Sequence, residues 1–197
     1  MQEGWIKVKK ILIVFFCMTM VSANIFAQSD LQGNSNVEKD KIGGWVGFPF
    51  IGLSYSHEFN DLMEFDLLIG STGIPFMSRQ VNIRTGLLFT VWEPVIDGQK
   101  CPLTIGPAFD ISSWMIFYEP ISVGVTLLCP IRWEVNFRRT PAFNLFIEAA
   151  PAIGFSYALT DTKYGVLSLH NKQINDKIAI SWVPHIGLGL RYRIPNK

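Results

Sequence analysis

The chain has 197 residues and a formal net charge of +1, so it lacks the basic excess typical of nucleic-acid-binding domains. Hydrophobic residues make up 49% of it and charged residues only 17%, a balance that suits an exported β-barrel, in which half of each strand faces lipid. Beyond the N-terminal segment, no apolar run approaches the roughly 18 continuous residues expected of a membrane-spanning helix.

Residues 1–27 have the layout of a secretory signal peptide. Three lysines precede a short apolar run over residues 11–21, and a region of small residues ends at Ala27, after which cleavage is expected. The alternative is an uncleaved anchor helix, but about 11 apolar residues fall short of the roughly 20 that span a bilayer. Removing this segment leaves enough chain for one domain.

Residues 28–42 are polar and without periodicity, which predicts a disordered N-terminal lead. From residue 43 onward, apolar and polar residues alternate between turn-like clusters, a pattern typical of strands with one apolar face. This alternation predicts a single domain over residues 43–197. The expected strands cover residues 45–59, 63–69, 80–92, 101–112, 121–137, 143–159, 164–170 and 178–194.

The expected strand over residues 121–137 shows why a barrel fits best. Its odd positions are all apolar, and its even positions are mostly small or polar. A typical globular strand runs only about 5–6 residues. The sequence therefore predicts an all-β fold, namely a single antiparallel up-and-down transmembrane β-barrel of about eight strands.

Aromatic residues are placed where the two rims of the lipid-facing band would lie. Trp182 and Tyr192 share one face of the last strand, ten residues apart. At about 3.3 Å per residue and a tilt of roughly 40°, that spacing covers about 25 Å of height, which matches the apolar band of an outer-membrane barrel. Trp133 and Phe137 repeat this aromatic girdle near one end of their strand.

The opposite, polar face of the strands carries charges that would line the barrel interior. An eight-stranded barrel is just wide enough for side chains to fill, and unpaired buried charge is costly, so we expect these charges to pair in a network. Antiparallel pairing about a turn near residue 140 places Arg132 opposite Glu148, and residue 134 opposite residue 146. The alternative is a pore lining that tunes selectivity. The predicted lumen network comprises Arg84, Asp110, Arg132, Glu134, Glu148, His185 and Arg191, and Glu58, Asp66 and Arg193 share the same register.

Four prolines, Pro107, Pro130, Pro151 and Pro184, fall inside expected strands, where proline cannot donate to a hydrogen-bond ladder. We expect a bulge or kink at each. A soluble periplasmic β-sandwich is the alternative fold, because it tolerates proline better, but it leaves the seventeen-residue alternation unexplained.

Two cysteines, Cys101 and Cys129, lie beyond the expected cleavage site, and both occupy apolar positions. An oxidising compartment would permit a disulfide between them. The alternative is a pair of unpaired thiols directed toward lipid or core.

The sequence predicts no catalytic, metal or cofactor site. His57 lies between Ser56 and Glu58, but adjacent residues of a strand point to opposite faces, which spoils a triad drawn from these three. No metal-ligand spacing, phosphate loop or nucleophile elbow is present. A lipid-modifying enzyme of the outer membrane stays an alternative to a non-enzymatic barrel.

Several segments, notably CPIRWEVNF and FNLFIEAAPAIGFSY together with the signal ending IFAQ, resemble the small outer-membrane β-barrels of Gram-negative bacteria, both OmpA-like and porin-like. The resemblance covers roughly residues 43–194 and rests on pattern. It implies a monomer in the outer membrane that contacts outer-membrane lipid and the insertion machinery, without nucleic acid or cofactor. The expected role is structural or interaction through loops, with a narrow transport pore as the alternative.

Overall fold

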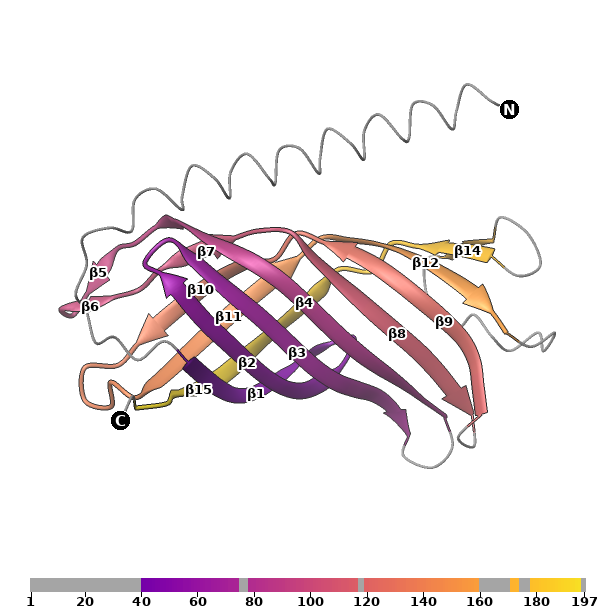
Figure 1. Ribbon diagram of the computed structural model, residues 1–197, viewed down its shortest axis with the longest axis horizontal. Helices are drawn as coiled ribbons and strands as arrows, with labels where there is room; N and C mark the ends of the chain where they lie inside the picture. Colours follow the sequence, from indigo (N-terminus) through magenta and orange to yellow (C-terminus); the bar gives the residue numbers. More distant parts are fainter. Residues whose placement is uncertain (1–39, 75–77, 117–118, 160–170, 174–177, 196–197) are drawn as a thin grey trace, which may run out of the picture. The chain divides into compact units, whose positions relative to one another are not determined.

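The computed structural model describes residues 40–74, 78–116, 119–159, 171–173 and 178–195, which belong to the compact unit Val37–Lys197 (Figure 1). The described part is built of strands, and none of it forms a helix long and apolar enough to cross a membrane. The predicted signal peptide, nearly all of the predicted lead and the expected strand over residues 164–170 lie outside the described residues.

Eight long antiparallel strands form the wall, each paired with its neighbours in the chain. Four of them are continuous and the other four are each divided in two, as β7–β8, β9–β10, β11–β12 and β14–β15. The bounds are β1 Asp40–Phe48, β2 Ile51–Asn60, β3 Met63–Ile74, β4 Ser78–Trp92, β7 Leu103–Ile105, β8 Ala108–Ile116, β9 Glu119–Leu128, β10 Ile131–Asn136, β11 Phe143–Ala150, β12 Ala152–Ala158, β14 Ile178–Ser181 and β15 His185–Arg193.

Three short strands lie beside this wall. β13 (Asn171–Gln173) pairs with β14, and β5 (Val95–Ile96) pairs with β6 (Gln99–Lys100) in a small separate hairpin. The hairpin turns at Asp97 and Gly98, both with positive φ, which is the conformation that a tight two-residue β-turn requires.

The wall closes on itself through the pairing of β1 with β15. A single row of paired residues can be followed around all eight strands, and it returns to the last strand ten residues from its starting point. Ten residues of about 3.3 Å against eight inter-strand steps of about 4.8 Å give a strand tilt of about 40°. The row runs Ser181, Gly154, Thr126, Asp110, Arg84, Leu68, Ser54, Gly43, Arg191.

The fold is thus an all-β, closed, eight-stranded antiparallel barrel, as predicted, and the alternative of a two-sheet sandwich is wrong. Each of the four in-strand prolines lies at the break that divides its strand in two, which confirms the expected kinks. They lie on four successive strands, so the breaks form one seam. Proline carbonyls still accept bonds across it, from Leu87 N to Pro107 O at 3.1 Å and from Cys129 N to Pro151 O at 3.1 Å.

Two predicted boundaries are wrong. The expected strand over residues 45–59 is a hairpin, because β1 ends at Phe48 and β2 begins at Ile51. The barrel domain begins before residue 43, since β1 already starts at Asp40, inside the segment predicted to be a disordered lead.

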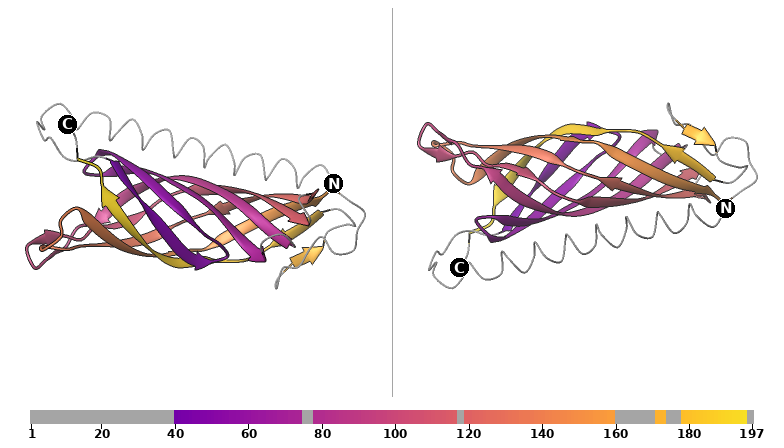
Figure 2. Two further views of the ribbon diagram at one scale, coloured as in Figure 1. Left: turned by 90° about the horizontal axis from the view of Figure 1, so that it is seen from below. Right: turned by 90° about the horizontal axis from the view of Figure 1, so that it is seen from above.

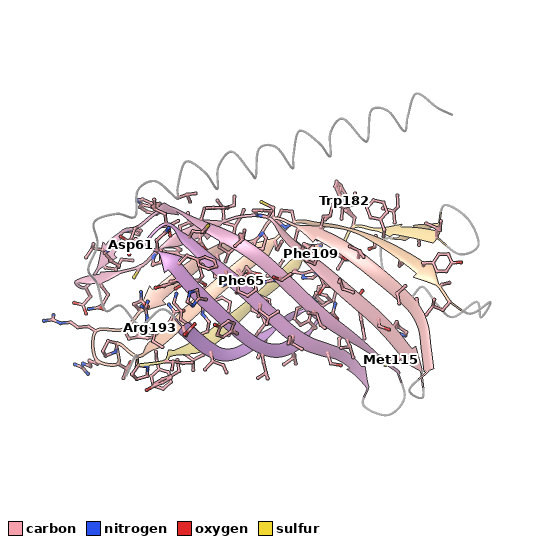
Figure 3. The ribbon with its side chains drawn as sticks, in the orientation of Figure 1. Asp61, Phe65, Phe109, Met115, Trp182 and Arg193 are labelled. Carbon is pink, nitrogen blue, oxygen red and sulfur yellow. The ribbon has the colours of Figure 1, made fainter. Side chains whose placement is uncertain are left out.

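The outer surface of the wall is apolar. On β15, Ile186, Leu188 and Leu190 are each about half exposed, at 54%, 53% and 49%. The four predicted girdle residues, Trp133, Phe137, Trp182 and Tyr192, all have exposed side chains, and Trp182 projects away from the wall in Figure 3. Cys129 is exposed on this surface, whereas Cys101 is buried, and both thiols are free.

Candidate functional site

The interior of the barrel holds the charged side chains that the alternation predicted. All seven residues of the predicted lumen network are buried, none more than 3% exposed, because the inward positions of β4, β8, β10, β11 and β15 carry them. Cross-strand pairing sets Arg132 opposite Glu148 and Glu134 opposite Phe146, which confirms the predicted register.

Five of the seven form a dense ionic network, whose first centre is Glu148. Its carboxylate lies 2.6 Å from Arg84 Nη1 and 2.8 Å from Arg132 Nη2. Asp66 joins the same two guanidinium groups, at 2.8 Å from Arg132 and 3.3 Å from Arg84. Each of these ions therefore has at least two partners of opposite charge.

A second centre lies nearer the rim where β1 starts and β15 ends. Glu64 there receives Lys41 at 2.8 Å, Arg191 at 2.8 Å and Arg132 at 3.4 Å. Glu134 pairs with Arg191 and, at 3.0 Å, with Lys41. Arg132 contacts carboxylates of both centres, so the two form one continuous network.

Lys41 and Glu64 were missed by reasoning from the sequence. Lys41 Nζ lies within 3.0 Å of three carboxylates, the third being Glu58 at 2.6 Å, yet the residue falls in the segment predicted to be disordered. Glu64 had a usable signal, because it alternates with Met63 and Phe65 and shares the register of Asp66.

The almost fully buried part of the network is charge-balanced. Four cations, Lys41, Arg84, Arg132 and Arg191, meet four almost fully buried carboxylates on Glu64, Asp66, Glu134 and Glu148, while Glu58 is partly exposed. Amides and hydroxyls complete the hydrogen bonding, as where Asn144 Nδ2 donates to Glu134 at 2.9 Å. These hydrogen bonds and opposite charges offset the cost of removing the buried ions from water. The ionic side chains and their partners fill the barrel interior between the proline seam and the rim where β1 starts.

Aromatic side chains pack directly on the ionic network. Trp45 and Phe146 stack with ring centroids 5.8 Å apart, and Phe50 and Leu68 complete the apolar cluster. The guanidinium groups of Arg132 and Arg191 lie 4.4 and 4.5 Å from the Phe146 ring centroid. Cation–π contacts of this kind are strongest where water is excluded. The aromatic cluster thus packs directly against the guanidinium groups of the network.

Glycine makes room for these rings. A Cβ on Gly187 would lie 2.6 Å from Trp45 Cζ2 and 2.7 Å from Gly47 Cα, closer than real Cβ atoms approach other atoms. The close approach of β1 and β15 over the Trp45 ring therefore favours glycine at both positions 47 and 187.

Two predicted network members stand apart from the ion pairs. Among the described residues, neither Asp110 nor His185 has an ion-pair partner. Asp110 accepts a 2.7 Å hydrogen bond from Asn82 Nδ2, and the His185 ring meets the Phe50 ring edge-on at 5.7 Å. Both residues lie in the lumen as predicted, and charge interactions with Arg84 reach both of them, but neither forms an ion pair within the described part of the chain. No group of three or more His, Cys, Asp or Glu residues in that part could hold a metal ion.

Comparison with known proteins found no matching family model, no matching curated protein and no matching solved structure. The barrel itself, with buried ionic side chains inside and apolar side chains outside, is therefore the basis for its function.

Proposed function

We propose that the protein is an outer-membrane β-barrel with a structural or loop-mediated interaction role, whose lumen does not conduct. The observation that carries this proposal is the inverted distribution of side chains. Four cations and four carboxylates lie inside, almost fully buried, while large apolar side chains cover the outside.

The apolar exterior supports a location in lipid. Monomeric proteins in water rarely expose contiguous apolar patches larger than a few hundred Å². Here Leu53 is 68% exposed, Ile147 58% and Leu127 52%, and they come from different sides of the wall. A strand tilt of about 40° lets such strands cross an apolar band of about 25 Å.

The ionic interior supports a sealed lumen. Arg84, Arg132 and Arg191 are fully buried and each is held by at least two acceptors from other strands. An eight-stranded barrel leaves an interior only as wide as its side chains. An ion would have to break several buried ion pairs to pass, so we expect no steady conductance.

Cell fractionation with a gel-mobility assay tests the membrane location. We expect the protein in the outer-membrane fraction, with faster migration in unheated than in boiled samples, because the barrel stays folded until heated. A soluble periplasmic protein without a heat-dependent shift would contradict the proposal. Purified protein in planar bilayers tests the lumen, and steady single-channel openings would favour the pore instead.

A further inference from the structure

A small polar cluster lies on the outer face of the wall, where apolar side chains otherwise prevail. Asp40 of β1 lies opposite His57 of β2, and Tyr55 is the next outward residue of β2. Tyr55 Oη donates a 2.8 Å hydrogen bond to Asp40 Oδ1, and His57 Nδ1 lies 2.8 Å from the same oxygen. We call these three residues the Asp40 cluster. Figure 1 and the left view of Figure 2 show β1 and β2 beside β15 in the wall.

The burial of neighbouring residues shows that the Asp40 cluster points outward. On β1, Ile42 is 49% exposed, whereas Lys41, between Asp40 and Ile42, is fully buried. On β2, the fully buried neighbour of His57 is Ser56. The side chains of His57 and Asp40 are 34% and 36% exposed. The cluster therefore meets the surroundings of the barrel, unlike the ionic network inside.

The Asp40 cluster lies at the level of the aromatic girdle near the rim that Arg193 marks in Figure 3. Pairing of β1 with β15 sets Ile42 opposite Tyr192, a girdle residue that is 40% exposed. Asp40 lies two residues further toward the rim, so at a tilt of about 40° it falls roughly 2 Å from the level of Tyr192 along the barrel axis. Girdle side chains sit at the level of lipid head groups. In a membrane, the cluster would thus meet head groups rather than the middle of the acyl chains.

The neighbours of the Asp40 cluster on the outer face are apolar. Phe65 of β3 is paired with His57, and the Phe59 ring meets the His57 ring edge-on with centroids 5.1 Å apart. Ile42 lies on the same face of β1. A carboxylate beside such surfaces needs partners that offset its loss of water. The same surfaces suit the acyl chains of a lipid whose head group reaches Asp40.

The outward atoms of the Asp40 cluster are acceptors. An ionised carboxylate only accepts, so His57 Nδ1 carries the proton of its bond to Asp40, and Nε2 of the neutral ring accepts. Both bonds that Asp40 receives from Tyr55 and His57 end on Oδ1, so Oδ2 keeps its accepting capacity within the described part of the chain. The cluster thus combines a negative charge with two acceptor atoms.

We propose that the Asp40 cluster binds the primary ammonium group of an amine-bearing phospholipid, of which phosphatidylethanolamine is the simplest. An ammonium group supplies a positive charge and three N–H donors, which match the charge and the acceptors of the cluster. The trimethylammonium group of phosphatidylcholine carries the charge but no N–H donor, and phosphatidylglycerol is anionic. This inference rests on the proposed membrane location.

Nuclear magnetic resonance of the chain from Gln28 onward, reconstituted in phosphatidylcholine nanodiscs at pH 8, tests the binding. Phosphatidylethanolamine or phosphatidylglycerol replaces the phosphatidylcholine stepwise. We expect phosphatidylethanolamine to shift the amide signals of Tyr55 and His57 saturably, with half-saturation at a mole fraction at least about tenfold lower than phosphatidylglycerol needs. Equal half-saturation by the two lipids, or no saturable shift with phosphatidylethanolamine, would overturn the proposal.

Free phosphoethanolamine tests whether the ligand is a lipid. It carries the same ammonium group without acyl chains, so it should leave the Tyr55 and His57 signals unchanged at the concentrations at which phosphatidylethanolamine saturates them. An equal response to the free head group would overturn a lipid as the ligand.

Variants locate the site. Asp40→Asn removes the charge with little change of shape and should raise the half-saturating mole fraction of phosphatidylethanolamine by about tenfold or more. Asp61→Asn is the matched control, because Asp61 is exposed in the β2–β3 turn at the same rim (Figure 3), and its response should be unchanged. Asp40→Lys should exchange the preference, so that phosphatidylglycerol acts at the lower mole fraction. Equal responses of the Asp40 variants and the control would overturn the proposal.

Heat-dependent gel mobility of the same samples separates this proposal from the proposed function. Folded, heat-modifiable barrels without a preference for phosphatidylethanolamine would mean that the Asp40 cluster only ties β1 to β2, and would leave the outer-membrane proposal standing. Protein that enters no nanodisc or membrane as a folded barrel would remove both.

Discussion

Arg132 and Glu148 face each other across β10 and β11 inside the barrel, with Arg132 Nη2 2.8 Å and Arg132 Nε 2.9 Å from Glu148 Oε2. Glu148 has a second cationic partner, because Arg84 Nη1 lies 2.6 Å from its other carboxylate oxygen. One carboxylate thus holds two guanidinium groups that come from different strands, β4 and β10.

Glu148→Leu should destabilise the barrel strongly, because it leaves two buried cations with fewer partners. Removing one member of a buried ion pair typically costs about 3–5 kcal/mol. Urea unfolding in micelles measures the loss in free energy of unfolding. Glu93→Gln is the control, since Glu93 pairs with Lys100 at 3.0 Å on the exposed hairpin and should cost less than about 1 kcal/mol. A loss no larger than that of the control would contradict the network.

Combining Arg132→Met with Glu148→Leu should recover part of the loss, since the double variant removes both partners of one pair. Recovery should be incomplete, because Arg84 still loses Glu148, and Asp66 loses Arg132, which lies 2.8 Å from it. A double-mutant cycle measures the coupling, which for contacting residues is about 0.5–3 kcal/mol. If the two losses simply add, Arg132 and Glu148 are not coupled.

Phe146→Ala should also destabilise the barrel, by about 3–5 kcal/mol, because it empties a fully buried position beneath the Trp45 ring and two guanidinium groups. Phe143→Ala is a closely matched control: the residue lies on the same strand, but its ring is 41% exposed on the outer surface. Thermal unfolding compares the two. Equal losses would mean that β11 does not direct Phe146 inward.

Gly187→Ala should cost about 1–3 kcal/mol, because the added methyl group meets both the Trp45 ring and the backbone of β1. Gly44→Ala should be tolerated, since nothing lies within 4 Å of the Cβ that it adds. Unfolding midpoints of the two variants check this difference. A harmless Gly187→Ala would show that the strands approach less closely than described.

The sequence was sufficient for the register of β10 and β11, because both strands alternate cleanly and the turn between them is short. It was insufficient at β1 and β2. The outward residues are even-numbered up to Phe48 and odd-numbered from Ile51, so the alternation changes phase at the two-residue turn. Trp45 hid this change, because it is an apolar residue on the inward face of β1, so the odd positions from residue 45 to residue 59 predicted one continuous apolar face.

The ionic partners could be predicted only in part for a related reason. Lys41 lies at the edge of a polar segment in which no periodicity marks a strand, so only tertiary pairing with β15 and β2 shows that it faces inward. That Asp110 accepts a hydrogen bond from Asn82 and forms no ion pair within the described residues could not be predicted either, because which buried groups meet depends on the tilt and stagger of the closed wall.

Spin-label accessibility on β15 tests the central claim, a β-barrel that spans a membrane, most directly. Labels at Leu188 and Leu190, outward positions near the middle of the strand, should be readily reached by oxygen and poorly reached by a water-soluble nickel complex in protein reconstituted in lipid vesicles. Oxygen concentrates in the apolar layer and the nickel complex stays in water. High nickel accessibility at both positions would contradict a membrane-spanning barrel.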